Sequence, residues 1–344
     1  MITIHSKNNN EMESLIKSLE EFSASKYRCF LCGKELFSGG YTQEHVIPRW
    51  AQKRYELWDQ RLTILNQTSI PYRQLTVPCC DECNNYRLKP IEDSLSQTVE
   101  QGKDAVRLLG GKLLSIWLGK ILYGLLYKEL TLLLDRSDPS EGTIITPEIL
   151  QRYRMHRFFL QQAREVVECV DFSPGSIYIF SAQELPEKKL EWDLCDNVDT
   201  LFIGCRVGKI ALIACLADGG AEQSMEDQFS DIFDIDLHPI QFREICAIVS
   251  YRSTLATRTP KHFVINGKPH KAHQMPLGGF SLKPYFEGWD DETYSKFLAF
   301  YLGEKENYFF QPPDKVITWL HDDNGNPRFM NFKDFPIMPK NIGG

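Results

Sequence analysis

The sequence predicts an α+β protein in which a small cysteine-stapled module precedes a larger mixed α+β domain. Two observations predict this division. Two Cys-x-x-Cys pairs fall within the first 83 residues, among short loop-like and strand-like segments. Beyond them, apolar helical patterns alternate with short strand patterns, which is typical of a mixed core. We therefore expect an N-terminal segment (residues 1–25), a cysteine-stapled module (26–110) and a mixed α+β domain (111–344).

Helical patterns occur in residues 11–22, 91–135 and 148–167, and glycines at 102, 110 and 111 divide the second stretch into at least two helices. A short helix is predicted for residues 11–22, after a polar lead. Residues 112–135 are apolar on nearly every face, so we expect a buried central helix there. Lys120, Lys128 and Glu129 interrupt this stretch, which argues against a membrane span. Residues 148–167 place apolar and aromatic side chains at a rough helical spacing.

Strand patterns dominate the second half of the chain. Residues 176–180 alternate as a strand does, and residues 201–216 read as two strands that turn near Gly208. Residues 245–251 and 262–265 are further predicted strands. The Asn266-Gly267 pair that follows is a strong signal for a tight hairpin turn.

Composition and charge limit the class of protein. The chain has 42% hydrophobic and 25% charged residues, which is ordinary for a globular protein. Its net charge of −7 does not suggest a nucleic-acid partner. Residues 26–93 nevertheless carry ten basic and eight acidic side chains, so the small basic excess lies with the cysteine pairs.

Cysteine usage and the start of the chain bear on its compartment. The opening residues MITIHSKNNNEMESL are polar and lack the apolar stretch of a secretory signal. For ten cysteines in a chain of this size without such a signal, we do not expect a secreted disulfide framework. We therefore expect a reducing, cytoplasmic setting.

Four cysteines form two close pairs, Cys29/Cys32 and Cys80/Cys83. Zinc prefers four soft ligands in a tetrahedron, and two such pairs supply them. The spacing favours Cys80 as a ligand, although the adjacent Cys79 leaves the choice open. We expect one structural Zn²⁺ on Cys29, Cys32, Cys80 and Cys83, against the alternative of a coincidence among ten cysteines.

Glu44 and His45 lie between the two pairs, just before Ile47-Pro48. A carboxylate can hold a hard cation, and an imidazole can take a proton from water, which is what phosphodiester hydrolysis needs. Neighbouring residues on a regular strand face opposite sides, so both serve one site only if the chain twists there. The alternative is a surface Glu-His pair without a role.

Asn84 follows the last cysteine directly. If a helix begins near it, the amide oxygen can bind a hard cation, and Arg87 and Lys89 lie close enough to meet phosphates. Asn is also a common helix N-cap, and the two interpretations are compatible.

Together these elements resemble the HNH, or ββα-metal, nuclease family. Its zinc-bearing members run Cys-x-x-Cys, Asp/Glu-His-Ile/Val-x-Pro, then Cys-x-x-Cys followed by His or Asn, with a basic residue three positions on. The matching positions here are Cys29/Cys32, Glu44-His45-Val46-Ile47-Pro48, Cys80/Cys83, Asn84 and Arg87. The resemblance implies that His45 is the general base and that Glu44 and Asn84 hold a catalytic Mg²⁺ or Mn²⁺.

The resemblance covers residues 26–95 of 344. The family's middle asparagine, which orients the catalytic histidine, normally precedes a leucine, where this chain has Gln74-Leu75. The nearest asparagine is Asn66, in a longer loop. A non-catalytic zinc module that binds nucleic acid or protein therefore stays an alternative, as does an RNA-directed nuclease.

DNA is the partner that the resemblance implies. Arg49, Arg87 and Lys89 are the expected phosphate contacts, and Lys53, Arg54 and Arg61 extend the same track. An ordinary solvated helix face is an equal alternative for the residues that follow Pro48.

Residues 111–344 carry no comparable catalytic signal. We interpret the pattern His270-Lys271-Ala272-His273 as a surface loop, because no cysteine or carboxylate cluster accompanies it. The apolar segment 112–135 must be covered by this domain or by a partner subunit. We expect a regulatory or self-associating body, with a plain scaffold as the alternative; family members often serve bacterial restriction or phage defence, which is an analogy only.

Overall fold

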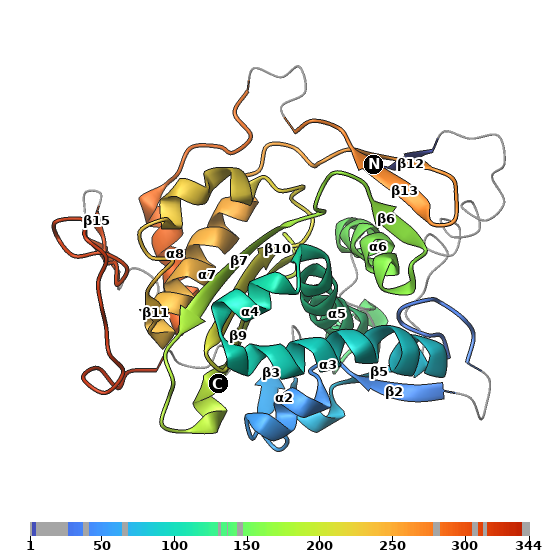
Figure 1. Cartoon of the computed structure of the whole chain (residues 1–344), viewed down its shortest axis with the longest axis horizontal. Coiled ribbons are helices and arrows are strands. Elements are labelled where there is room, and N and C mark those ends of the chain that lie inside the picture. The colour runs from blue at the N-terminus through green and yellow to red at the C-terminus, as the bar shows by residue number, and fades with distance from the viewer. Residues whose placement is uncertain are drawn as a thin grey trace. The chain divides into compact units, whose positions relative to one another are not determined.

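The structure is a computed structural model, and it describes residues 2–4, 27–36, 41–63, 68–129, 132–135, 137–142, 147–277, 283–304, 309–311 and 315–338. Helices and several small sheets make up this part of the chain (Figure 1), so the predicted α+β class is confirmed. The helix expected at residues 11–22 lies outside the described residues.

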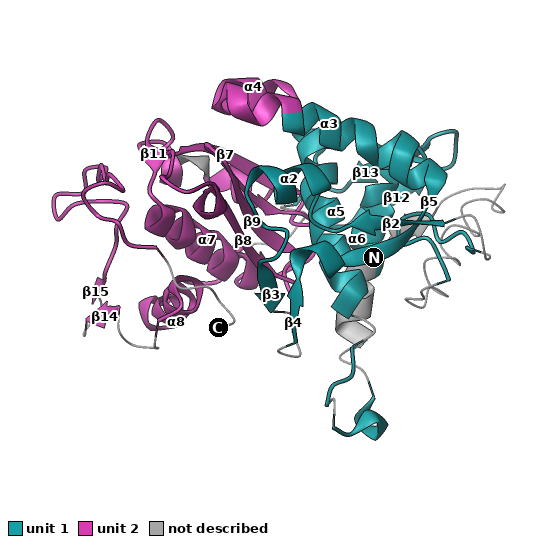
Figure 2. Cartoon of the chain, turned by 90° about the horizontal axis from the view of Figure 1, so that it is seen from below, with its two compact units in different colours: residues 1–96, 111–174, 260–277 teal, residues 97–110, 175–259, 278–344 magenta. Residues whose placement is uncertain are grey.

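The chain folds into two compact units, each assembled from separate segments (Figure 2). Unit 1 comprises residues 1–96, 111–174 and 260–277; unit 2 comprises 97–110, 175–259 and 278–344. The segments expected from the sequence were consecutive, with a boundary at residue 110. The units differ from them because residues after 110 return to pack on the cysteine-bearing strands.

The cysteine-bearing part of unit 1 is a two-stranded hairpin followed by a helix. Strand β2 (Tyr41–His45) pairs antiparallel with β5 (Thr76–Cys80), with Tyr41 opposite Cys80 and His45 opposite Thr76. A π-helical segment, η2 (Glu82–Leu88), leads directly into α3 (Lys89–Thr98). Between the two strands lie α2 (Arg49–Arg54), β3 (Arg61–Thr63), β4 (Ser69–Pro71) and the short turn η1 (Tyr72–Gln74).

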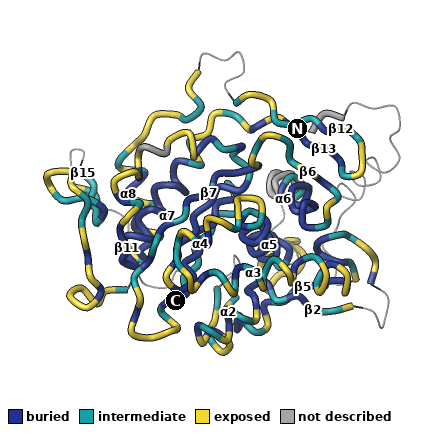
Figure 3. The backbone as a smooth tube through the Cα atoms, viewed as in Figure 1, coloured by how far each residue is buried: buried dark blue, intermediate teal, exposed yellow. Residues whose placement is uncertain are grey.

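Two longer helices complete the core of unit 1. Helix α5 (Gly111–Glu129) is buried along most of its length (Figure 3), as expected from its apolar sequence, and it ends before the predicted limit of residue 135. Helix α6 (Pro147–Leu160) packs against it and continues into η5 (Gln161–Arg164). The imidazole Nε2 of the buried His156 lies 2.8 Å from the Gly119 carbonyl oxygen, joining α6 to α5.

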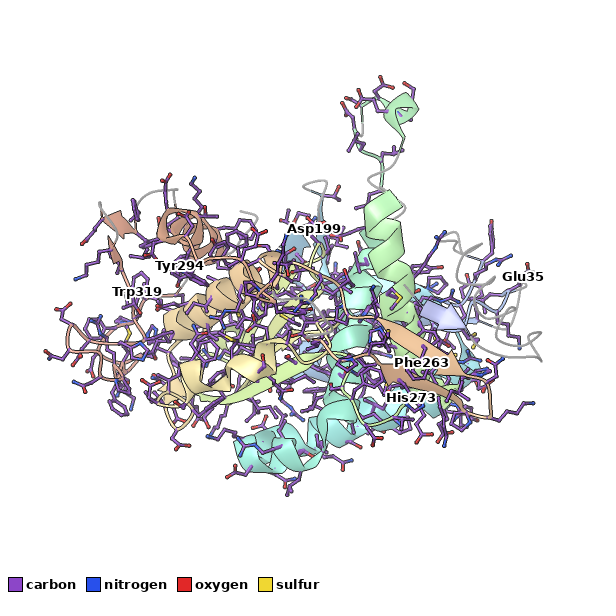
Figure 4. All side chains as sticks on the ribbon, turned by 90° about the horizontal axis from the view of Figure 1, so that it is seen from above. Glu35, Asp199, Phe263, His273, Tyr294 and Trp319 are labelled. Carbon is purple, nitrogen blue, oxygen red and sulfur yellow. The ribbon has the colours of Figure 1, made fainter. Side chains whose placement is uncertain are left out.

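A four-stranded sheet in unit 1 has the order β1-β12-β13-β6. Strands β12 (His262–Ile265) and β13 (His270–Gln274) pair on either side of the tight turn predicted at Asn266-Gly267, and β1 (Ile2–Ile4) and β6 (Val167–Cys169) flank them. The prediction of a surface loop at residues 270–273 is wrong. These residues form β13, because His270 and Ala272 alternate into the core while His273 stacks on Phe263 across the hairpin, 5.1 Å between ring centroids (Figure 4).

Unit 2 is built on a five-stranded sheet of order β11-β7-β10-β9-β8. Its strands are β7 (Ser176–Ala182), β8 (Trp192–Asn197), β9 (Phe202–Val207), β10 (Ile210–Cys215) and β11 (Asp236–Leu237). Both strands predicted within residues 201–216 are therefore confirmed, with their turn at Gly208. Helix α7 (Pro239–Thr254) packs across β8, β9 and β10, and α8 (Asp291–Leu302) packs on α7 (Figure 1).

The strand predicted at residues 245–251 is wrong, because this segment lies within α7. Every residue from Pro239 to Arg252 is buried. The helix therefore has no exposed polar face, and the sequence lacks the 3.6-residue alternation of apolar and polar residues that identifies a surface helix. A short run of buried apolar residues reads alike as a strand or as a buried helix. The decisive signal lies upstream, where His238 caps the helix and Gln241 accepts a hydrogen bond from the His238 N–H.

Shorter elements complete the described chain. They are η3 (Val99–Gln101), α4 (Lys103–Leu108), η4 (Pro139–Glu141), η6 (Lys188–Glu191), η7 (Glu222–Phe229), β14 (Phe310–Gln311) and β15 (Lys315–Val316). Among the described residues, none of the helices has the length and apolar character needed to cross a membrane.

Candidate functional site

Four cysteine sulfurs form a compact cluster in unit 1. The Sγ atoms of Cys29, Cys32, Cys80 and Cys83 all lie within 4.8 Å of one another. The Sγ atoms of Cys32 and Cys80 are 3.8 Å apart. This separation matches the edge of a tetrahedral zinc–thiolate site, about 3.8 Å for Zn–S bonds of about 2.3 Å. The cluster can therefore hold a metal ion such as zinc.

The backbone around the cluster is shaped to present these sulfurs. Gly33 takes a positive φ of 76° and donates its N–H to the Cys29 carbonyl oxygen, which folds the first pair into a tight turn. The Lys34 N–H points at Cys32 Sγ, and the Cys83 N–H points at Cys80 Sγ, each at 3.5 Å. Such N–H···S contacts stabilise thiolates, which are the form that binds metal.

Cys79 is placed beside the cluster and not within it. Its Sγ lies 3.9 Å from Cys29 Sγ, in a contact in which Cys29 is the donor, and its side chain is fully buried. Hydrogen bonds with Cys32 and then Cys79 hold the pKa of the Cys29 thiol well below its usual range. The four clustered sulfurs include Cys80, the residue that the spacing favours, and Cys79 contacts Cys29 from outside the cluster.

Glu44 is drawn into a buried ion cluster. Its carboxylate, with a side chain 7% exposed, contacts the ammonium group of Lys120 from helix α5. The same ammonium lies 2.6 Å from Glu92 Oε1 on α3. Burial, the largest cause, raises the pKa of Glu44 to about 7, although Lys120 opposes the shift.

His45, the next residue, has different surroundings. Its ring stacks on Trp58, with centroids 6.1 Å apart and planes 26° from parallel. The Arg49 guanidinium lies 6.0 Å from the same indole. Burial, followed by the positive charges of Arg49 and Lys120, lowers the pKa of His45. The neutral imidazole, which alone can accept a proton, is therefore favoured.

Asn84 lies on η2, inside the first helical turn, so it is not the N-cap residue. Its amide nitrogen donates to Thr42 Oγ1 at 2.8 Å, which ties the helix start to strand β2. This bond uses the nitrogen and not the oxygen that would bind a cation. Thr42 and Glu44 are two positions apart on the strand, so they share a face. The structure thus brings Asn84 to the Glu44 face of the hairpin, and His45 contacts Trp58 separately.

The segment expected to supply the middle residue runs beside the end of β2. The Val46 N–H donates to the Leu75 carbonyl oxygen at 3.0 Å, so Gln74-Leu75 lies next to the residue that follows His45. The other candidate, Asn66, lies outside the described residues.

The expected phosphate contacts are mostly paired with other groups. Arg87 Nη1 lies 2.8 Å from Glu165 Oε2, and Lys89 Nζ lies 2.6 Å from Asp93 Oδ2. Arg49 reaches the Trp58 indole beside His45, which makes it the cation best placed for a phosphate at that imidazole. An anion at Arg87 or Lys89 has to replace these exposed carboxylates, which surface pairs allow at small cost.

Sequence reasoning missed Lys120 and Glu92. Lys120 was read only as a charge that interrupts an apolar segment. A lysine in the middle of a helix with no polar face must be paired, because an isolated buried charge is very costly. A lysine in this apolar helix therefore indicated a buried ion pair, but the sequence alone does not identify the carboxylates that pair with it.

Comparisons of the chain with protein-family models, with curated proteins and with solved structures find no match. Its function is therefore inferred from the chemistry of the residues described above.

Proposed function

We propose that this chain is a metal-dependent DNA endonuclease of the HNH type, which hydrolyses phosphodiester bonds. One observation carries the proposal: an antiparallel hairpin with His45 at the end of its first strand leads into a helix whose first turn holds Asn84. The four-cysteine cluster pins the loop before the hairpin to the junction of hairpin and helix. This order of elements is the one that the resemblance to ββα-metal nucleases implies, and it supports the proposal.

His45 is the general base in this proposal. Its lowered pKa keeps the imidazole neutral near pH 7, so a ring nitrogen has a lone pair for a proton of the attacking water. Stacking on Trp58 restricts rotation of the ring and presents it in one orientation. Arg49 on the same indole places a positive charge where the phosphate would lie.

The catalytic Mg²⁺ or Mn²⁺ would be held by Glu44 and Asn84, and it would neutralise charge on the scissile phosphate. Carboxylate and amide oxygens are hard ligands that suit these ions. Glu44 has to share its carboxylate with Lys120, whose ammonium already contacts Oε1. The cysteine cluster serves a separate purpose, since thiolates select zinc and staple the fold.

A second candidate function is a zinc module that binds nucleic acid without cutting it. The observation that favours it is the buried pairing of Glu44 with Lys120, which withdraws the proposed metal ligand. Under this alternative the basic residues bind DNA, and no divalent ion produces cleavage.

The experiment that separates these functions is a nicking assay with the full chain. Supercoiled plasmid and structured RNA are incubated side by side with Mg²⁺, Mn²⁺, Ca²⁺ or EDTA. The proposal expects DNA cleavage with Mg²⁺ or Mn²⁺ and none with EDTA. Retention of plasmid on the protein without cleavage in any metal supports the binding module, and cleavage of RNA alone supports an RNA-directed enzyme.

A further inference from the structure

Helix α5 lies outside the hairpin-and-helix motif in sequence, yet it packs directly beneath it. A Cβ atom added at Gly124 would lie 2.9 Å from Val46 Cγ2, so the helix backbone touches the residue after His45. Tyr123 packs on Phe30 of the first cysteine turn, with ring centroids 5.9 Å apart. The Tyr127 hydroxyl donates to the Arg28 carbonyl oxygen at 3.2 Å.

Lys120 lies one helical turn before Gly124, on the same face of α5. Its ammonium group is 2% exposed and has four oxygen partners. Two are carboxylates, on Glu44 and, at 2.6 Å, on Glu92. The others are the backbone carbonyl oxygens of His45 at 2.7 Å and Val46 at 3.3 Å. One cation thus binds the end of β2 and helix α3 together.

The ammonium group of Lys120 is enclosed by its four oxygen partners. An ammonium has three N–H donors, and here they meet carboxylates and carbonyl oxygens in place of water. The group is therefore a fixed, fully coordinated charge.

We propose that Lys120 is a positioning residue of the nuclease, which fixes the backbone carrying His45 against the helix that carries Asn84 and orients Glu44 through one carboxylate oxygen. This inference rests on the proposed function. Lys120 contacts the carbonyl of the base residue itself, so its loss lets that strand end move. A displacement of about 1 Å in a reacting group costs about 100-fold in rate.

Lys120→Met is the test, with Lys128→Met as its matched control. Lys128 lies on the same helix, and its ammonium contacts the Thr76 carbonyl oxygen of strand β5 at 3.4 Å, across the hairpin from His45, so its loss leaves the contacts of Lys120 to β2 in place. With Mn²⁺ saturating, we expect Lys120→Met to lower kcat about 30- to 100-fold with little change in KM. Lys128→Met should change kcat less than about threefold, and both variants should keep the wild-type zinc content.

Hydrogen–deuterium exchange gives a readout that does not depend on cleavage. In Lys120→Met, amides of residues 41–48 and 82–92 should exchange faster, whereas those of 27–34 should not; Lys128→Met should leave both groups unchanged. Unchanged exchange, or a kcat equal to wild type, overturns the proposal. A uniform rise in exchange across unit 1 also overturns it, because it indicates a purely structural ion pair.

Removal of Lys120 leaves two buried carboxylates, which can prevent folding. Lys120→Met/Glu92→Gln relieves that repulsion, and Glu92→Gln alone, which keeps the contacts to Glu44 and His45, should retain near wild-type kcat. A double variant that is folded and fully active contradicts the proposal. A wild type that cuts no DNA contradicts the proposed function instead, and exchange at residues 41–48 then decides whether Lys120 fixes that strand.

Discussion

The sulfur atoms of Cys32 and Cys80 lie 3.8 Å apart although 48 residues separate them along the chain. The hairpin and the turn at Gly33 bring them together, and the separation is that of two ligands on one tetrahedral ion. We expect a long loop closed in this way to depend on a bound ion, because the free energy of metal binding becomes folding free energy in so small a module.

Adjacent cysteines provide a sharp test of the metal site. Cys80→Ser should remove most of the bound zinc and destabilise unit 1, because Cys80 belongs to the four-sulfur cluster. Cys79→Ser should keep one zinc per chain, because Cys79 contacts Cys29 from outside the cluster. Elemental analysis of both purified variants measures the difference. Equal zinc content in the two variants contradicts the assignment.

Gly124 should tolerate no side chain, because a Cβ there would lie 2.9 Å from Val46. In an open helix, Gly→Ala stabilises by about 1 kcal/mol. Here the overlap costs about 1–3 kcal/mol, so Gly124→Ala should lower the free energy of unfolding. Gly111→Ala, at the start of the same helix with open space around its Cβ, should not. Urea denaturation of both variants measures the change in the free energy of unfolding. A more stable Gly124→Ala variant would contradict the close contact between Gly124 and Val46.

His156 should make the protein acid-sensitive. Burial lowers its pKa from 6.5 to about 4 in the folded protein. Between these values the unfolded chain binds a proton that the folded chain does not, so stability is retained above pH 6.5 and declines as pH falls toward 4. The loss is roughly 3 kcal/mol at most. Melting temperatures of wild type and His156→Gln across this range check it: the variant should show the shallower decline, and parallel curves exclude this role.

Arg49 should contribute to DNA affinity through an electrostatic contact with a backbone phosphate. Removing one phosphate contact lowers the slope of log K against log salt concentration by about 0.9. We expect this change for Arg49→Ala, which loses the cation beside His45 and Trp58. Arg54→Ala is the control, because Arg54 donates to the Ser96 carbonyl oxygen and lies over Trp50. Fluorescence anisotropy with a duplex in EDTA measures both; equal slopes for Arg49→Ala and wild type contradict the placement.

Local signals in the sequence predicted local structure well. The Cys-x-x-Cys spacing anticipated the four-sulfur cluster, and turns were correctly anticipated at Gly208 and at Asn266-Gly267. Each turn and each cysteine pair depends on residues close together along the chain, whereas the fold brings the two pairs together across 48 residues. Residues 245–251 were wrongly predicted as a strand, because a helix that is buried on every side lacks the alternation of apolar and polar residues that distinguishes it from a strand.

Contacts between residues far apart along the chain could not be predicted from the sequence. The boundary expected at residue 110 separates α5 from the hairpin. In the structure, however, Lys120 of α5 donates to the His45 carbonyl oxygen, and Gly124 of α5 packs against Val46. A fragment ending at residue 110 would lack this support. The pairing of Lys120 with Glu44 and Glu92 likewise depends on three elements that only the fold brings together.

The central claim is that His45 takes the proton from the attacking water. Single-turnover cleavage of supercoiled plasmid with Mn²⁺ tests it most directly, comparing His45→Ala with Gln43→Ala, an exposed position two residues earlier on the same face of β2. The account predicts that His45→Ala lowers the cleavage rate at least about 100-fold while zinc content stays at wild type, and that Gln43→Ala cuts normally. Cleavage by His45→Ala at the wild-type rate would contradict it.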